Sequence, residues 1–309
     1  MRIVLIAGGR TAEAAGTRGS AAHLEQAARA LGHRVETLEV PADPDTRWSA
    51  LASARQHDVV LPLISGLEGA LELLDVPYVG SPPDAAALAA NKATFNTLLT
   101  GWGLRTVPWE LHDVGRDGVS ASPAVPGPWY VKPARLGASY GISRVDAPGG
   151  LGTAVRAAAD HDNLVLIEQE VPRPFIEVEV AAIVGASARI SPPMEIRAPG
   201  ALWRDPRWKY SLDELPVLYQ GGAAQECLDA VRLMIERSGV AGAVRFDLFV
   251  SRGQAVFVGE VNALPGHGAA STFPRIFELA GVSRPEQLEM MLEAAVRNHS
   301  RAASQRVRG

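Results

Sequence analysis

The sequence has 309 residues, of which 47% are hydrophobic and 21% charged, with a formal net charge of -4. At about 100 to 200 residues per domain, a chain of this length is expected to form two or three domains. Its charges form no basic block, which argues against a nucleic-acid-binding protein. No segment reaches the roughly 18 apolar residues of a membrane span, and the N-terminal apolar run is too short for a signal peptide. With a single cysteine, Cys227, these features predict a cytoplasmic protein.

The first part of the chain alternates short apolar runs with helical patterns. Strands are expected at 2–7, 34–40, 57–64 and 76–81, and helices at 20–32 and 67–74. Such alternation is typical of a parallel sheet with helical crossovers. The sequence therefore predicts a small parallel α/β domain over residues 1–82.

Two further units follow. A helix over 82–103 and strands at 128–133, 140–145 and 164–169 predict a smaller α+β domain over 83–173. The remainder, 174–309, is expected to contain a strand at 175–184, a polar loop at 196–221, a helix at 222–238, a hairpin over 244–262 and two terminal helices. The overall prediction is a mixed α/β and α+β protein of three domains.

Two glycine-containing loops follow predicted strands. AGGRTAE, which contains Glu13, lacks the third glycine of a dinucleotide fingerprint, so a tight turn and a ligand role for Glu13 are both open. YVKPARLGASYGISRV places Lys132 at a strand end, followed by small residues from Gly137 to Ser139. Such a loop lets backbone amides approach a polyphosphate, although it is not a P-loop. Taken alone, it is more typical of a hairpin turn with an exposed lysine.

Four polar side chains interrupt the predicted terminal hairpin. Arg245 and Asp247 are two residues apart on one strand, and Glu260 and Asn262 are two apart on the other, so each pair shares a face. Carboxylate and amide oxygens are the ligands that Mg²⁺ prefers. A solvated face with a salt bridge is the alternative, but the flanking residues are too apolar for an exposed ribbon. The pattern favours a metal site formed by Asp247, Glu260 and Asn262.

Carboxylates also recur near strand ends in the middle of the chain, at Glu168, Glu177 and Glu179, where each alone would be unremarkable. Together with the glycine loop, the lysines and the predicted metal site, they indicate nucleotide-dependent phosphoryl chemistry. The seven histidines do not cluster at zinc spacing, and no nucleophile elbow is present.

The ordered motifs resemble the D-alanine–D-alanine ligase family of the ATP-grasp superfamily. In chain order they are GGRTAE, LEGALELLDVPYVGS, ALAANKATFNTLL, YVKPARLGASYGISRV, VLIEQEV, WKY, VRFDLFV and GEVNALPG. The resemblance implies an ATP-grasp fold preceded by the N-terminal α/β domain, with the metal site in the C-terminal unit. It also implies ATP, Mg²⁺ or Mn²⁺, small-molecule amino-acid substrates and a homodimer, with no nucleic-acid or membrane partner.

The resemblance also implies roles for individual residues. Those matching the ATP-binding positions are Lys92, Lys132, Gly137, Ser139, Glu168, Val171, Glu177 and Lys209. Asp247, Glu260 and Asn262 match the family's magnesium ligands. Arg245 and the Gly266 amide match groups that stabilise the oxyanion of the reaction. Glu13 matches the carboxylate that receives the first amino acid's ammonium, while Tyr210 and Ser271 match the second-substrate side.

The substrate-side motifs depart from the family pattern at four positions. Ala138 replaces a serine that links the N-terminal glutamate to the tyrosine of WKY, Ser65 replaces a histidine, Ala15 replaces a second glutamate, and Thr272 replaces a leucine. An alanine cannot make the serine's hydrogen bond, so D-alanine as both substrates does not follow.

The expected activity is an ADP-forming peptide ligation through an acyl phosphate. If the protein is a ligase, two alternatives to D-alanine as its substrates are open. It could join other amino acids or amines in specialised metabolism, or it could use ammonia or a hydroxy acid as the acceptor. A non-catalytic nucleotide-binding regulatory module is a third alternative, of a different class.

Overall fold

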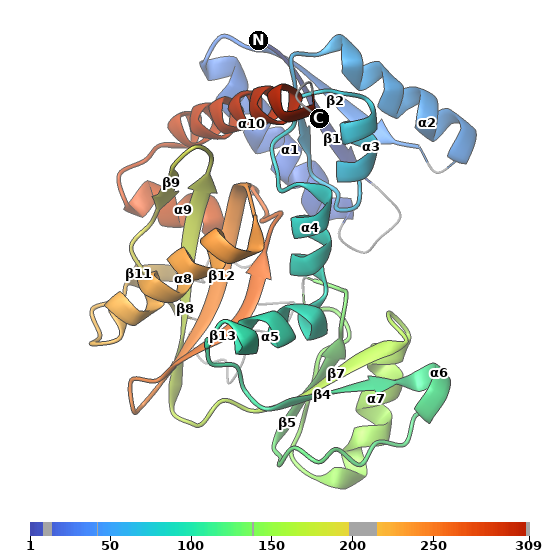
Figure 1. Cartoon of the computed structure of the whole chain (residues 1–309), viewed down its shortest axis with the longest axis vertical. Coiled ribbons are helices and arrows are strands. Elements are labelled where there is room, and N and C mark those ends of the chain that lie inside the picture. The colour runs from blue at the N-terminus through green and yellow to red at the C-terminus, as the bar shows by residue number, and fades with distance from the viewer. Residues whose placement is uncertain (9–13, 42, 138, 198–214, 307–309) are drawn as a thin grey trace.

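The computed structural model of the chain describes residues 1–8, 14–41, 43–137, 139–197 and 215–306. Its strands form three sheets that follow one another along the chain (Figure 1). The fold is mixed α/β, as the sequence predicts. Among the described residues, no helix combines the length and the apolar character needed to cross a membrane.

The N-terminal sheet is parallel, with the order β2-β1-β3. Its strands are β1 (Arg2–Gly8), β2 (Arg34–Val40) and β3 (Val59–Pro62). The helices of this part are α1 (Ala14–Ala30), α2 (Pro44–Ser53) and α3 (Glu68–Leu73), with a 3-10 turn η1 (Ala54–Gln56). β1 is central and buried from Ile3 to Gly8, which explains its continuous apolar sequence. The strand expected at 76–81 is wrong: only an isolated bridge joins Tyr78 to Val60.

The helix predicted over 82–103 is two helices, α4 (Pro83–Ala90) and α5 (Lys92–Gly101). The break lies at Asn91, whose backbone is extended and whose side chain accepts a hydrogen bond from Thr94 N at 3.2 Å. Asn91 is therefore the N-cap of α5, a position that asparagine favours. This cap places Lys92 in the first turn of α5.

The central sheet is antiparallel, with the order β4-β7-β5-β6. Its strands are β4 (Trp109–Asp113), β5 (Trp129–Pro133), β6 (Ser143–Val145) and β7 (Leu164–Gln169). Its helices are α6 (Val114–Asp117) and α7 (Leu151–Ala159), with a 3-10 turn η2 (Pro148–Gly150). The edge strand β4 was not predicted because its half-exposed residues WELHD lack an apolar alternation.

The C-terminal sheet has the order β11-β10-β8-β12-β13, and β9 also pairs with β8. Its strands are β8 (Phe175–Val184), β9 (Ala188–Ile190), β10 (Met194–Arg197), β11 (Leu215–Leu218), β12 (Gly242–Ser251) and β13 (Val256–Asn262). Three helices accompany it: α8 (Ala224–Ser238), α9 (Thr272–Leu279) and α10 (Arg284–Arg306). The polar loop expected at 196–221 overlaps β10 and β11, and its middle part lies outside the described residues.

The hydrophobic cores show how these sheets are joined. One core combines β1 and α1 with residues of β8, α9 and α10, and Figure 1 shows α10 crossing back to the N-terminal sheet. A second core lies under α8 on β8 and β12, and the central sheet has its own core beneath α7. The first and third sheets therefore share a core. The domain boundaries at 82 and 173 and the homodimer stay predictions.

Candidate active site

Three carboxylates lie in one row across the C-terminal sheet. β12 pairs with β8 on one side and β13 on the other, and the register places Glu179, Asp247 and Glu260 opposite one another. Arg245 lies opposite Asn262 in the next row of the same face. The hairpin is thus part of a larger sheet, and its flanking residues lie in a buried core. The alternative of a solvated face is therefore wrong, although the salt bridge that it included does form, between Arg245 and Asp247.

Arg245 is held by groups from three elements. Its Nε and Nη2 donate to Asp247 Oδ1 and Oδ2, each at 2.7 Å, and its Nη1 donates to Thr272 Oγ1 at 3.3 Å. Nε also lies 3.4 Å from Glu179 Oε2, to which the Thr272 hydroxyl donates a short hydrogen bond. Arg245 is 7% exposed, so these partners offset the desolvation of its charge. They fix the guanidinium at the sheet face.

The predicted metal set fits a hard divalent cation by its donor chemistry. Asp247 and Glu260 supply carboxylate oxygens beside the amide of Asn262, whose Nδ2 donates to Asp247 Oδ2 at 3.2 Å. Burial raises the pKa of the Asp247 carboxyl, Arg245 opposes this rise, and Glu179 and Glu260 add to it. A cation would relieve that accumulation of negative charge.

No group of three or more histidine, cysteine, aspartate or glutamate side chains in the described part of the chain is arranged to hold a metal. The set here has two carboxylates and one amide. Mg²⁺ commonly takes one or two carboxylates and completes its coordination with waters and phosphate oxygens. The set is therefore suited to a cation that arrives with a phosphate ligand.

A cavity of about 150 Å³ opens beside this row, between the central and C-terminal sheets. Its apolar walls include Tyr130, Ile142, Val171, Phe175, Leu248, Phe249 and Val258. Its polar walls include Lys132, Gly137, Ser139, Glu168, Glu177, Asp247 and Glu260. A pocket with both kinds of wall suits a ligand that has a flat apolar part and a charged part.

Two lysines with little exposure to solvent lie at this cavity: Lys132 lines it, and Lys92 contacts Leu136 and Glu260, which line it. Lys132 Nζ on β5 lies 2.6 Å from Glu168 Oε2 on β7, and its side chain is 12% exposed. Lys92 Nζ donates to Leu136 O at 2.7 Å and lies 3.6 Å from Glu260 Oε2. The alternative of an exposed hairpin lysine at 132 is therefore wrong. The Lys132 side chain lies where an anionic ligand in the cavity would meet it, and the Lys92 ammonium group lies next to the cavity-lining Glu260.

The glycine loop packs closely against neighbouring side chains. Ser139 and Gly141 have φ values of 61° and 69°, in the left-handed region that glycine tolerates best. A Cβ added at Gly141 would lie 2.7 Å from His161 Cδ2 and 2.9 Å from Pro133 Cγ. Ser139 is buried and lines the cavity with Gly137. The loop therefore lies tightly against the base of β5.

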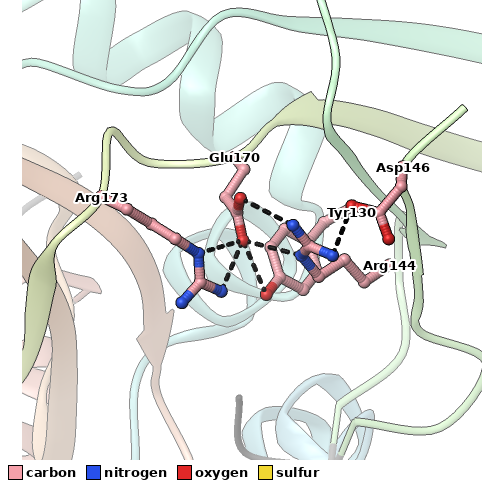
Figure 2. Close-up of polar contacts among 5 residues, drawn as sticks. All are labelled: Tyr130, Arg144, Asp146, Glu170 and Arg173. Carbon is pink, nitrogen blue, oxygen red and sulfur yellow. Dashed lines mark hydrogen bonds and ion pairs between the residues drawn. The ribbon is translucent and has the colours of Figure 1, made fainter. Parts of the chain in front are cut away.

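The segment that crosses from β7 to β8 is anchored by Glu170, which sequence reasoning missed. Figure 2 shows Arg144 and Arg173 reaching Glu170 from opposite sides, with Tyr130 beside them. Arg144 Nε donates to Glu170 Oε1 at 2.8 Å, and Arg173 Nη2 donates to the same oxygen at 2.7 Å. These hydrogen bonds hold the pKa of Glu170 at about 2. The network fixes the segment that carries Val171.

The described substrate-side residues lie around the start of α9 and after β3, and Thr272 among them contacts Arg245 of the site. A Cβ added at Gly266 would meet Ser271 Oγ at 2.7 Å, so these two residues are in close contact at the start of α9. His267 N donates to Ser20 Oγ on α1 at 3.0 Å, and Ser65 lies exposed between β3 and α3. The expected site residues Glu13, Ala138, Lys209 and Tyr210 lie outside the described residues.

Comparison with known proteins finds relatives of one family. Residues 116–293 match the family model described as D-ala D-ala ligase C-terminus. The chain is 36% identical to a D-alanine–D-alanine ligase of Kineococcus radiotolerans over 272 residues, covering 80% of this chain and 72% of that protein. It is 34% identical to the D-alanine–D-alanine ligase of Frankia casuarinae over 255 residues, covering 78% and 67%.

A solved structure also shares the fold. The D-alanine–D-alanine ligase from Bacillus anthracis, which was crystallised with ATP, superposes with a TM-score of 0.82 at 20% identity. The match covers 98% of this chain and 99% of that one.

Proposed function

The chain belongs to the D-alanine–D-alanine ligase family, and we propose that it is an ATP- and Mg²⁺-dependent ligase that joins the carboxylate of one amino acid to the amine of another. The observation that carries this proposal is the face on which Arg245, Asp247, Glu260 and Asn262 lie together. That face borders a cavity that Lys132 lines, and Lys92 contacts two of the cavity-lining residues, Leu136 and Glu260. A pure nucleotide-binding module has little use for this combination.

The cavity is proposed to hold ATP. Its apolar walls at Val171 and Phe249 suit a base. Lys132 in its wall and Lys92 beside it suit phosphates. Glu177 is proposed to accept from the ribose hydroxyls, and Glu168 to bind the base edge. The loop with Gly137 and Ser139 would cover the phosphates, and Lys209 would reach them by family resemblance.

Asp247, Glu260 and Asn262 are proposed to hold Mg²⁺, with Mn²⁺ as the expected substitute. When bound, the cation offsets phosphate charge during phosphoryl transfer. Lys92 lies next to Glu260 and would contribute a second positive charge at the same place. The carboxylates would therefore bind a cation that is also coordinated by the phosphates of ATP.

The proposed reaction has two steps. The γ-phosphoryl group of ATP passes to a carboxylate oxygen of the first amino acid, which gives an acyl phosphate and ADP. The amine of the second amino acid then attacks the carbonyl carbon, loses a proton, and displaces inorganic phosphate. Arg245 and the Gly266 amide are proposed to stabilise the oxyanion of the tetrahedral intermediate. A closed site would protect the acyl phosphate from water.

The identity of the two substrates is the open part of the proposal. Glu13 is proposed to bind the first ammonium, and Tyr210 and Ser271 to lie on the second-substrate side. D-alanine at both positions competes with other amino acids or amines because Ser65, Ala138 and Thr272 depart from the family pattern. An assay of phosphate release with D- and L-amino acids, followed by the product mass, distinguishes these cases.

A further inference from the structure

We propose that Glu179 and Thr272 form a clamp that positions Arg245, so that its guanidinium keeps its place when Asp247 takes another partner. The inference rests on the proposed function, because it concerns the arginine assigned to the reacting carbonyl. Neither Glu179 nor Thr272 needs to touch the reacting atoms. Both act through Arg245.

Glu179 is buried where a carboxylate requires specific partners. It lies in the middle of β8, opposite Asp247 on β12, and is 1% exposed. Its Oε2 accepts a hydrogen bond from the Thr272 hydroxyl and lies 3.4 Å from Arg245 Nε. An ionised carboxylate at this depth is costly unless it is paired and hydrogen-bonded. Its nearest described cation is the guanidinium that the reaction uses.

Arg245 therefore has a carboxylate on each side. Its bidentate hydrogen bond to Asp247 is the shorter of the two contacts. In the proposed function, however, Asp247 shares its charge with a divalent cation and becomes a weaker partner for the guanidinium. Glu179 stays in place, because its position opposite Asp247 is fixed by the β8–β12 register. Glu179 can therefore balance the charge of Arg245 and hold its orientation while Asp247 binds the cation.

Thr272 completes the clamp from a different element. Its Oγ1 accepts from Arg245 Nη1 and donates to Glu179 Oε2, so it links the two side chains directly. Thr272 is the first residue of α9 and is 2% exposed. The helix is anchored by Phe273 and Phe277 in the core that also contains Ala181 of β8. The hydroxyl thus sits at a fixed place, and a leucine there could make neither hydrogen bond.

The test compares Thr272→Val, which removes the hydroxyl and keeps the shape, with Thr272→Ser, which keeps the hydroxyl. Glu179→Gln removes the charge, and Glu293→Gln, at an exposed i,i+4 pair with Arg297, is the matched surface control. The measurements are kcat for ADP formation with the amino-acid pair that the wild type uses, equilibrium ATP binding in the presence of Mg²⁺, and thermal unfolding. Where Glu179→Gln fails to fold, Thr272→Val carries the test.

We expect Thr272→Val to lower kcat about tenfold while the ATP Kd changes by less than about threefold, and Thr272→Ser to recover most of the loss. The double variant with Glu179→Gln should be no slower than Glu179→Gln alone, because both changes act through one guanidinium. An active wild type whose Thr272→Val variant keeps its kcat would overturn the clamp alone. Equal losses of kcat and stability in the valine and serine variants would also overturn it. A wild type that turns over no pair of substrates contradicts the proposed function itself, and the clamp with it.

Discussion

Asp247 and Glu260 lie directly opposite each other across β12 and β13, and Lys92 Nζ lies 3.6 Å from Glu260 Oε2. Lys92 comes from the first turn of α5, far from the hairpin in sequence. The pair of carboxylates and the ammonium group therefore meet through the fold. This meeting point supports the proposed placement of a metal-bound triphosphate.

Glu260→Gln is expected to abolish most of the activity and leave the fold nearly intact. The amide keeps the shape but loses the charge that a cation requires, so kcat/KM should fall by about two orders of magnitude or more. Lys92 keeps its hydrogen bond to Leu136 O, so the free energy of unfolding should fall by only about 1 kcal/mol. Steady-state kinetics and urea denaturation check both parts. Wild-type turnover in this variant would refute the assignment of the metal site.

Gly141→Ala is expected to distort the glycine loop. The left-handed φ of 69° and the contacts with His161 and Pro133 leave no room for a Cβ. We expect a loss of about 1 to 3 kcal/mol in stability and a raised KM for ATP. Gly149→Ala is the control, since a Cβ there meets nothing within 4 Å and the backbone is not left-handed. Equal behaviour of the two variants would show that the loop tolerates the change.

Glu170 should make stability depend on pH in the acidic range. Its pKa is about 2 in the folded protein, against an ordinary 4.5, because Arg144 and Arg173 donate to it. A lowered carboxyl pKa stabilises the folded state above pH 4.5, and this contribution is lost as the pH falls towards 2. The contribution should be on the order of 2 kcal/mol, because the arginines are partly exposed. Urea denaturation from pH 6 to pH 3 should show that the free energy of unfolding falls less in Glu170→Gln than in the wild type.

His267 should produce a second and separate pH dependence. Burial lowers its pKa to about 4, from an ordinary 6.5, and the charge of Arg284 adds to this. Because the unfolded chain binds the proton first, stability should fall as the pH drops from 6.5 to 4. The ring packs edge-on against Phe273, with centroids 5.2 Å apart, so protonation would bury an unwanted charge. His267→Gln should remove this part of the pH profile. An unchanged profile would mean that the fold does not lower the pKa of this ring.

The sequence predicted the elements whose patterns are local. The buried strands β1, β8 and β12 and the amphipathic helix α8 follow from their apolar periodicity. The edge strand β4 lacks such a pattern, and the break between α4 and α5 depends on a single capping residue, Asn91. The apolar run at 76–81 has strand composition but makes only an isolated bridge to β3.

The same distinction applies to the site. Arg245 and Asp247 could be placed on one face because a strand has a period of two. Glu179 could not be assigned to that face, since its place depends on β8 being the other neighbour of β12. Glu170 also depends on a distant partner, Arg144 of β6, in addition to Arg173 three residues away. The useful signal for Glu179 was its presence, with Glu177, in an otherwise apolar strand.

The central claim is that this chain activates one amino acid with ATP and joins it to another. The most direct measurement is ADP and phosphate release with Mg²⁺ across single and paired D- and L-amino acids, with the mass of each product. We predict ADP formation that depends on the amino acids, with a product whose mass equals the two substrates less one water. ATP binding without stimulation by any amino acid, hydroxy acid or amine would contradict the account.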